Sequence, residues 1–347
     1  MTHRSQHFLF GILNWGLGHA TRSMVVIDHL IAQGHQVTIA SSGIAYTYLN
    51  RAYPNLAFIE LPDYGVAYSS RSALWGTLKS MNSILHGIEN EHYLIASIFE
   101  NSPPDVVISD NRYGVHLPGA LNIFIGHQYH WPQDTLGIVR RKHNDYLEPF
   151  SELWIPDFEP PHGLSGNISK PPENKKHTYI GPLSRIKPEP KVEQDIDVLF
   201  LLSGLEPLRT LFEDKIIAQQ EDLTYSSYLV RGTNDLRDGI PMPSIDLASK
   251  EDVQALISRS KIVISQSGYS TIMDLATSKK KAGFIPTKGM PEQQYLARFA
   301  KKHFGVPFQQ LDDLNISQLV ADAEKAEGFS NYSVLEFSLA EYLNQRF

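Results

Sequence analysis

The chain has 347 residues, a length typical of two domains, and 42% of its residues are hydrophobic and 20% charged. Its formal net charge of −7 excludes a general nucleic-acid binder, which needs a basic surface. The absence of cysteine excludes disulfides, thiolate metal sites and cysteine nucleophiles. No apolar stretch approaches the roughly 20 residues that cross a bilayer. The first residues do not resemble a signal peptide. We therefore expect a cytoplasmic protein, and peripheral contact with a membrane surface stays open.

The first half of the chain alternates short apolar runs with patterns of helical period. Such alternation favours a parallel sheet with right-handed crossover helices. The predicted strands cover residues 7–13, 36–40, 57–61, 105–109, 122–126 and 153–155, and the predicted helices cover 20–33 and about 72–100.

A stretch rich in proline and glycine, residues 157–190, interrupts the alternation and holds one short extended piece at 178–180. The alternation then restarts, and an amphipathic helix is predicted over residues 334–346. The strands predicted in between cover residues 198–202, 228–230, 262–265 and 282–285, and the helices cover 208–219, 252–260, 270–278 and 292–302.

These elements predict an α/β protein of two Rossmann-like, doubly wound domains that face each other across a cleft. We place an N-terminal domain at residues 1–160, a linker at 161–190, a C-terminal domain at 191–330 and a final helix within 331–347. Ligands of such sheets bind at the carboxyl ends of the strands, so the cleft is the expected site.

The first motif, Asn-Trp-Gly-Leu-Gly-His at residues 14–19, joins the first strand to the first helix. Gly16 and Gly18 would let the backbone approach a ligand closely, and the helix start offers N–H groups to phosphate. His19 lies in a loop at a strand end, where a general base is useful. The structural alternative is a tight turn that His19 caps.

The second motif, Ser203 and Gly204 followed by Pro207, lies at the equivalent position in the second half. Pro207 suits the first turn of a helix. The serine hydroxyl and the glycine N–H are candidate phosphate donors, and a plain capped turn is the alternative.

The third motif, residues 265–274, has a Ser/Gly turn between a buried strand and a helix. Its polar groups gather at the helix start, which suits a diphosphate. Asp274 lies one helical turn further on, where a carboxylate accepts hydrogen bonds from a ribose diol. The alternative for Asp274 is an exposed position on the helix. The candidate diphosphate ligands of this motif are Ser267, Gly268, Ser270 and Thr271.

The fourth motif, residues 286–294, follows the next strand and ends in Gln293 and Gln294. Side-chain amides both donate and accept hydrogen bonds, which suits the hydroxyls of a sugar. The alternative is a pair of solvated glutamines on a helix surface.

Polar and aromatic residues also follow two strands of the first half, at 110–113 and 127–130. This content predicts an acceptor site, in which Asp110 would orient His19. His127 and His130 are further candidates for the base. The alternative is that these residues cap the strand ends.

The third and fourth motifs together resemble the C-terminal signature of glycosyltransferase family 28, over about residues 263–305. That family includes the N-acetylglucosaminyltransferase that makes lipid II and the diacylglycerol glycosyltransferases. The loop with His19 matches the family's N-terminal loop by position. The resemblance implies a GT-B fold, a UDP-activated sugar as donor, and a C-terminal helix that returns to the N-terminal domain.

The resemblance also implies roles for residues of the second half. Asp274 stands where the family usually has a glutamate on the ribose, and it is one methylene shorter. Gln293 and Gln294 stand at the family's paired glutamines, one of which holds the donor sugar.

Four further residues follow from the same resemblance. Ser203 and Gly204 fall at the family's second glycine-rich loop, which here has fewer glycines than in the lipid II enzyme. Leu247 and Ala248 lie in the segment that contacts the base in relatives.

The implied function is inverting, metal-independent transfer from a UDP-sugar, with UDP-N-acetylglucosamine among the candidates, to a hydroxyl of a lipid or glycan acceptor. We expect no cofactor and no metal, because the sequence has no Asp-x-Asp motif and no His/Asp cluster at metal-ligand spacing. One alternative is a UDP-sugar 2-epimerase, although Tyr269 follows Gly268 where those enzymes usually have a second glycine. The other alternative is a non-catalytic nucleotide-sugar binder. The presence of both domains and of His19 in this chain argues against it.

Overall fold

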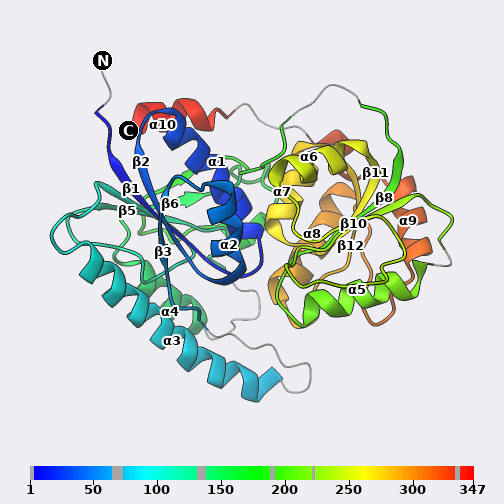
Figure 1. Cartoon of the computed structure of the whole chain (residues 1–347), viewed down its shortest axis with the longest axis horizontal. Helices are drawn as coiled ribbons and strands as arrows, with labels where there is room; N and C mark the ends of the chain where they lie inside the picture. The colour runs from blue at the N-terminus through cyan, green and yellow to red at the C-terminus, as the bar shows by residue number, and fades with distance from the viewer. Residues whose placement is uncertain (1–3, 65–72, 131–137, 188–191, 221–222, 333–336) are drawn as a thin grey trace. The chain divides into compact units, whose positions relative to one another are not determined.

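The computed structural model describes residues 4–64, 73–130, 138–187, 192–220, 223–332 and 337–347, and it divides into two compact units. Each unit is built on its own parallel sheet (Figure 1). Unit 1 consists of Met1–Asn14, Arg22–Leu183 and Leu335–Phe347, and unit 2 consists of Trp15–Thr21 and Ser184–Val334.

The sheet of unit 1 has seven strands in the order β3-β2-β1-β4-β5-β6-β7, and all its neighbours pair in parallel. The chain adds strands outward from β1 on one side and then from β4 on the other. The strand order therefore reverses between β1 and β4, the position where doubly wound sheets bind ligands. The strands are β1 (His7–Ile12), β2 (Gln36–Ser41), β3 (Ala57–Glu60), β4 (Val106–Asp110), β5 (Leu121–Ile125), β6 (Glu152–Ile155) and β7 (His177–Tyr179).

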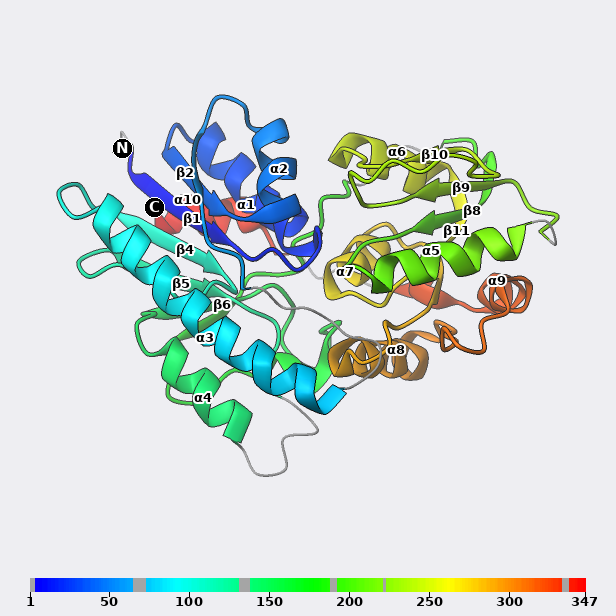
Figure 2. The ribbon, with the colours of Figure 1, turned by 60° about the horizontal axis from the view of Figure 1, so that its bottom comes forward.

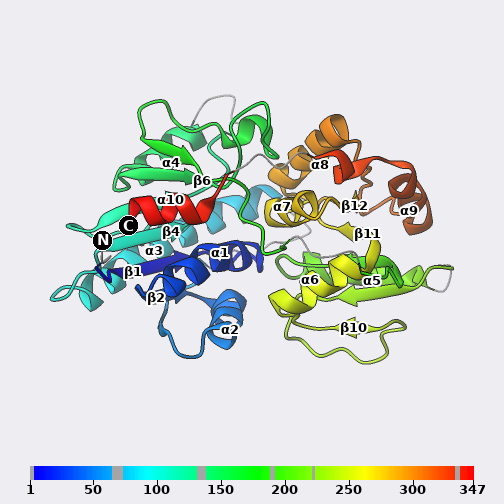
Figure 3. The same cartoon turned by 90° about the horizontal axis from the view of Figure 1, so that it is seen from above.

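Helices cover both faces of this sheet, as Figures 2 and 3 show. Alternate residues of β1 point to opposite faces. Leu9 packs with Ile95 of α3, whereas the ring of Phe8 lies 4.9 Å from that of Phe347, just after α10. No helix in the described ranges combines the length and the apolar character needed to span a membrane. The helices of this unit are α1 (Gly18–Ala32), of which the part from Arg22 onward belongs here, α2 (Gly43–Ala52), α3 (Ala73–Ile98), α4 (Ile138–Leu147) and α10 (Leu339–Arg346).

The carboxylate of Glu152, on β6, attaches α10 to the first sheet. It accepts hydrogen bonds from Arg346 Nη2 at 2.8 Å and from the Tyr342 hydroxyl at 3.1 Å. His29 of α1 lies 3.0 Å from the side-chain oxygen of Asn344, and Figure 3 shows α10 beside α1. The predicted helix at 334–346 begins partly outside the described residues, and in the described part helix α10 begins only at Leu339, after its N-cap Ser338.

The linker predicted at residues 161–190 is wrong up to Leu183, because these residues belong to unit 1. The buried carboxylate of Asp157 accepts hydrogen bonds from the backbone N–H groups of Leu164 and Ser165, which folds this stretch into a compact loop. The extended piece expected at 178–180 is strand β7 at the sheet edge. Proline and glycine here mark tight turns of an ordered loop, and residues 188–190 lie outside the described residues.

The sheet of unit 2 has five parallel strands in the order β10-β9-β8-β11-β12, so its order reverses between β8 and β11. Its core includes Phe200 of β8, Ile264 of β11 and Leu319 of α9. The strands are β8 (Ile196–Leu201), β9 (Ser227–Val230), β10 (Ser244–Ile245), β11 (Ser260–Ser265) and β12 (Lys281–Phe284), and the helices are α5 (Leu208–Ala218), α6 (Lys250–Arg259), α7 (Tyr269–Thr277), α8 (Pro291–Phe304) and α9 (Ile316–Lys325).

Candidate functional site

Two loops leave the sheet of unit 2 side by side at its reversal point. Leu201 at the end of β8 pairs with Ser265 at the end of β11. The side chain of Gln266 then joins the two loops, since its Oε1 accepts from the backbone N–H of Ser203 at 3.2 Å and its Nε2 donates to the Ser203 carbonyl at 2.7 Å. The second and third sequence motifs therefore form one continuous loop surface.

The start of α7 lies on this surface and has open space at its N-cap residue. Gly268 is the N-cap and carries no side-chain cap, and a Cβ built there meets no heavy atom within 4 Å. The first N–H groups of a helix have no intrahelical partner and carry a partial positive charge, so they attract anions. Thr271 lies half-buried on the same turn. This geometry suits a phosphate group.

The remaining predicted polar residues of this region make hydrogen bonds within unit 2. The hydroxyl of Ser267 donates to the Gln293 carbonyl at 2.8 Å. The side-chain oxygen of Gln293 accepts from the Thr287 N–H at 2.9 Å. Gln294 exchanges two hydrogen bonds with Gln310, at 2.9 and 3.0 Å. The structure therefore assigns these side chains a role in bracing the loop after β12, and their contact with a sugar stays a prediction.

The first motif lies beside these loops, because residues Trp15–Thr21 belong to unit 2. The Ser270 hydroxyl donates to the Gly18 carbonyl at 2.8 Å. Gly16 has a φ of +73°, and a Cβ there would lie 2.9 Å from the backbone of Gly204. Glycine at position 16 thus serves close backbone approach. His19 follows Gly18 in this segment and is half-buried.

Asp274 lies inside unit 2, so the alternative of an exposed helix position is wrong. It is 2% exposed, and its carboxylate accepts from the Ser184 hydroxyl at 2.9 Å and from Arg185, through the backbone N–H at 3.1 Å and Nε at 2.9 Å. Burial raises the pKa of Asp274, and the charge of Arg185 opposes that rise. The ribose role stays a prediction, and it would require the carboxylate to exchange these partners.

Leu247 and Ala248 lie between β10 and α6 and are 8% and 4% exposed. The next residue, Ser249, starts α6 with a capping box, in which its hydroxyl accepts from the Asp252 N–H at 3.0 Å and Asp252 bonds back to the Ser249 backbone. This cap fixes the backbone of residues 247–249 relative to the start of α6. Contact of Leu247 and Ala248 with a nucleotide base stays a prediction.

A buried charged cluster lies at the reversal point of unit 1. Asp110 ends β4 and accepts hydrogen bonds from Arg22 Nε at 2.7 Å and from the Ser23 hydroxyl at 2.9 Å, and Arg22 Nη2 forms a further ion pair with it. Arg22 Nη1 also lies 2.9 Å from Nδ1 of His127. Asp110 and Arg22 are 0% and 1% exposed. A buried arginine needs such a counter-charge, and the sequence motifs did not indicate this pairing.

A second buried ion pair holds the loop after β4. Arg112 Nη1 lies 3.3 Å from the carboxylate of Glu91, and the guanidinium lies 4.9 Å from the centre of the Tyr64 ring. Desolvation raises the pKa of Glu91. Asp110 and Arg112 are both buried in these ion pairs. That residues 110–113 contribute to an acceptor site, and that Asp110 orients His19, stay predictions. The ion pair of Arg112 with Glu91 helps to position the loop after β4.

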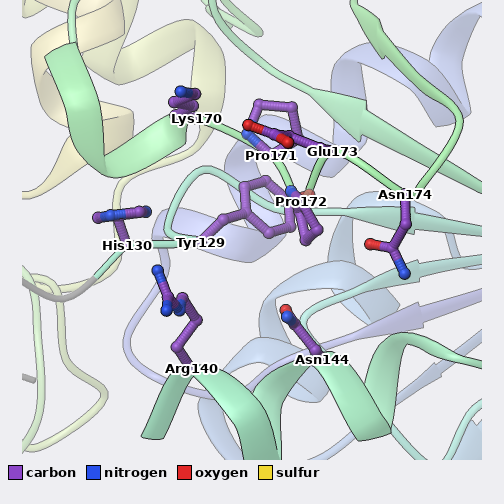
Figure 4. A pocket seen from close by; sticks show the side chains of 9 residues that line it. All are labelled: Tyr129, His130, Arg140, Asn144, Lys170, Pro171, Pro172, Glu173 and Asn174. Carbon is purple, nitrogen blue, oxygen red and sulfur yellow. The ribbon is translucent and has the colours of Figure 1, made fainter. Parts of the chain in front are cut away.

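Unit 1 contains a cavity of about 510 Å³ beyond the end of β5. Three segments contribute to it: the loop after β5, helix α4 and the loop that precedes β7, as Figure 4 shows. Of the predicted acceptor residues, Tyr129 and His130 lie here. The full lining comprises Tyr129, His130, Arg140, Asn144, Lys170, Pro171, Pro172, Glu173 and Asn174.

The comparisons with known proteins agree with this fold. Residues 6–125 match the model described as glycosyl transferase family 1, and residues 237–335 match the glycosyltransferase family 28 C-terminal domain. A protein of Methanosarcina acetivorans named as an uncharacterised glycosyltransferase is 24% identical over 310 residues, which cover 80% of this chain and 79% of that protein.

Solved structures show the same architecture. The glycosyltransferase of kitacinnamycin aligns with a TM-score of 0.67 at 14% identity, over 99% of this chain and 100% of that one. UGT89C1 of Arabidopsis thaliana, solved with UDP, aligns with a TM-score of 0.61 at 13% identity, over 99% and 94% of the two chains. The family matches, the named relatives and the fold together identify the chain as a glycosyltransferase of the GT-B type.

Proposed function

We propose that the chain transfers a sugar from a UDP-sugar to a hydroxyl group of an acceptor, with inversion at the anomeric carbon and without a metal ion. The observation that carries the donor assignment is the loop surface of unit 2, where Gln266 joins the loops after β8 and β11 in front of the open start of α7. The match to the family 28 C-terminal domain covers the same region. The structure of the Arabidopsis protein with UDP offers independent support.

In the proposed reaction, His19 removes the proton from the acceptor hydroxyl while its oxygen attacks the anomeric carbon. The bond from that carbon to the diphosphate oxygen breaks, and UDP leaves with the electron pair. The N–H groups at the start of α7 stabilise the charge that develops on the diphosphate. Ser270 holds the first motif against α7 through Gly18, which keeps His19 in the same unit as the proposed phosphate site.

Gly268→Ala tests the donor site. We expect it to weaken UDP binding about tenfold in calorimetry, because the added methyl group would occupy the open space at the start of α7. The glycine has a φ of −70°, which alanine also adopts, so folding should lose no more than about 1 kcal/mol from the change of N-cap. An unchanged dissociation constant for UDP would place the nucleotide elsewhere.

Chelation tests the proposed independence from metal ions. In the described parts of the chain, no three His, Asp or Glu side chains gather in a way that could hold an ion. We expect hydrolysis or transfer of a UDP-sugar to keep its rate after dialysis against EDTA. Loss of activity that Mg²⁺ or Mn²⁺ restores would contradict this part of the proposal.

A further inference from the structure

We propose that a network of ion pairs in unit 2 positions the segment predicted to contact the nucleotide base, and so determines which base the donor site accepts. The inference rests on the proposed function, since this segment belongs to the proposed donor site. The arginine network runs from the loop after β8, through α5, to the segment between β10 and α6. Its members, in order of contact, are Glu206, Arg209, Glu213, Arg231 and Asp246.

Glu213 of α5 is the centre of the arginine network. Its carboxylate is 0% exposed and accepts hydrogen bonds from Arg209 Nη1 at 2.5 Å and from Arg231 Nε at 2.7 Å. Arg237 lies further out, with Nη1 3.7 Å from the same carboxylate. Burial would raise the pKa of Glu213, but the hydrogen bonds from Arg231 and Arg209 lower it below its usual value. The carboxylate is therefore charged at neutral pH and serves both buried guanidinium groups as counter-charge.

Arg231 connects this centre to the base segment, which we define as residues 246–248. It lies directly after β9, and its Nη1 donates to the Asp246 carboxylate at 2.5 Å. The backbone N–H groups of Gly232 and Thr233 both donate to the Asp246 carbonyl, at 2.8 and 3.1 Å. The first residue of the base segment is thus held through its side chain and through its carbonyl oxygen.

The rest of the base segment has hydrogen-bonding groups available for a ligand. Leu247 and Ala248 are 8% and 4% exposed. Within the described ranges, their backbone N–H and C=O groups make no hydrogen bond to the protein. Backbone groups at such low exposure normally have partners. Pyrimidine bases differ in the groups on their edges, since cytosine carries an amino donor where uracil carries a carbonyl acceptor. The exact placement of the base segment therefore affects which base it can pair with.

Arg209 connects the same centre to the loop after β8. Its Nε forms an ion pair with Glu206, two residues after Gly204, and Glu206 also accepts from the Thr210 hydroxyl at 2.7 Å. Arg209 Nη1 donates to the Arg231 carbonyl at 3.3 Å as well. The network thus has two arms, one ending beside the candidate phosphate donors and the other at the base segment. We infer that its members are positioning residues for the two parts of the donor site.

Arg231→Lys tests the inference through base selectivity. The substitution keeps the positive charge, but one ammonium group does not reproduce the directions in which the planar guanidinium binds Glu213 and Asp246. The dissociation constants of UDP and CDP are measured by calorimetry on the full chain, and we expect the unmodified chain to prefer UDP. In the variant, the ratio of the CDP constant to the UDP constant should fall about three- to tenfold, the loss of one hydrogen bond to the base.

Two other arginines provide matched comparisons. Arg209→Lys disturbs the arm at the loop after β8, so it should weaken UDP and CDP by the same factor and leave their ratio unchanged. Arg259→Lys disturbs the ion pair of Arg259 with Asp195, whose side chains are 46% and 47% exposed. Arg259 lies at the end of α6, whereas the base segment precedes the start of that helix. This variant should change neither dissociation constant.

Asp246→Asn keeps the inference testable if Arg231→Lys does not fold. It is nearly isosteric, removes the charge that Arg231 binds, and affects a side chain that is 39% exposed. It should lower the ratio in the same direction, and thermal unfolding shows whether each variant folds. In a folded variant of either position, an unchanged ratio or an equal weakening of UDP and CDP would overturn the inference. So would an equal fall of the ratio in Arg259→Lys.

Binding of UDP, CDP, ADP and GDP by the unmodified chain separates this failure from failure of the proposed function. A chain that prefers UDP, and keeps that preference in Arg231→Lys, retains the proposed donor and loses the role of the network. A chain that prefers another of the four contradicts the UDP donor, and the effect of Arg231→Lys on that preference then decides the inference. A chain that binds none of them contradicts both.

Discussion

Replacing His19 with alanine is expected to lower kcat by about 10²–10⁴, the usual contribution of a general base. UDP affinity should stay within about twofold, because the proposed phosphate contacts come from the start of α7 and from residues 203–204. The measurements are steady-state kinetics with an acceptor, or slow hydrolysis of the UDP-sugar until one is known, and calorimetry with UDP. His86→Ala is a suitable control, since its side chain is 78% exposed on α3.

Full activity of His19→Ala with a true acceptor would make His19 a structural residue. The base would then be sought among Asp110, His127 and His130, the other candidates that the sequence predicts. The structure ranks these three, because Asp110 and His127 are buried against Arg22, whereas His130 is exposed and lines the cavity of unit 1. His130→Ala would be the next variant to measure.

Replacing Asp110 with alanine is expected to lower the free energy of unfolding by about 3–5 kcal/mol, because it leaves the charge of Arg22 buried without its carboxylate. The Ser23 hydroxyl would lose its acceptor as well. Urea denaturation followed by circular dichroism measures the loss. Asp110→Asn should also lower the free energy of unfolding, since it too removes the counter-charge of Arg22.

Asp312→Ala provides the matched control for this prediction. It breaks the ion pair of Asp312 with Lys288, whose two side chains are 66% and 69% exposed. Such a surface pair contributes about 0–1 kcal/mol. Equal losses for Asp110→Ala and Asp312→Ala would mean that the Arg22–Asp110 pair does not stabilise unit 1. Asp110 would then return to the candidates for a direct role in the reaction.

The class of the fold could be predicted from the sequence because buried parallel strands leave a local signal. The apolar run of β11 and the Ser/Gly turn after it are contiguous in the chain, so the strand, the loop and the helix start can be predicted from one segment. Strand β10 has only two residues, too few for any period. Helix α9 is absent from the predicted elements, although Ile316, Leu319, Val320 and Ala323 show the spacing of a buried helical face.

The candidate site was less predictable, because its defining contacts join distant residues. Arg22 and Asp110 are 88 positions apart, and Asp274 meets Arg185 across 89. No local pattern encodes such pairs. The residues that line the cavity of unit 1 come from three segments, and nothing in the sequence distinguishes its basic side chains from ordinary surface charges. Motifs therefore located the loops of the proposed donor site, whereas the buried ion pairs and the cavity of unit 1 could be found only from the fold.

The contact of α10 with the first sheet has a consequence for synthesis on the ribosome. Unit 1 is discontinuous in sequence, since α10 follows all of unit 2. A nascent chain therefore exposes the apolar surface around Phe8 and Trp154 while roughly 150 further residues are translated, and such exposed surface promotes aggregation. Unit 2 from Ser184 onward emerges as one nearly continuous stretch. The unit that starts first is thus completed last.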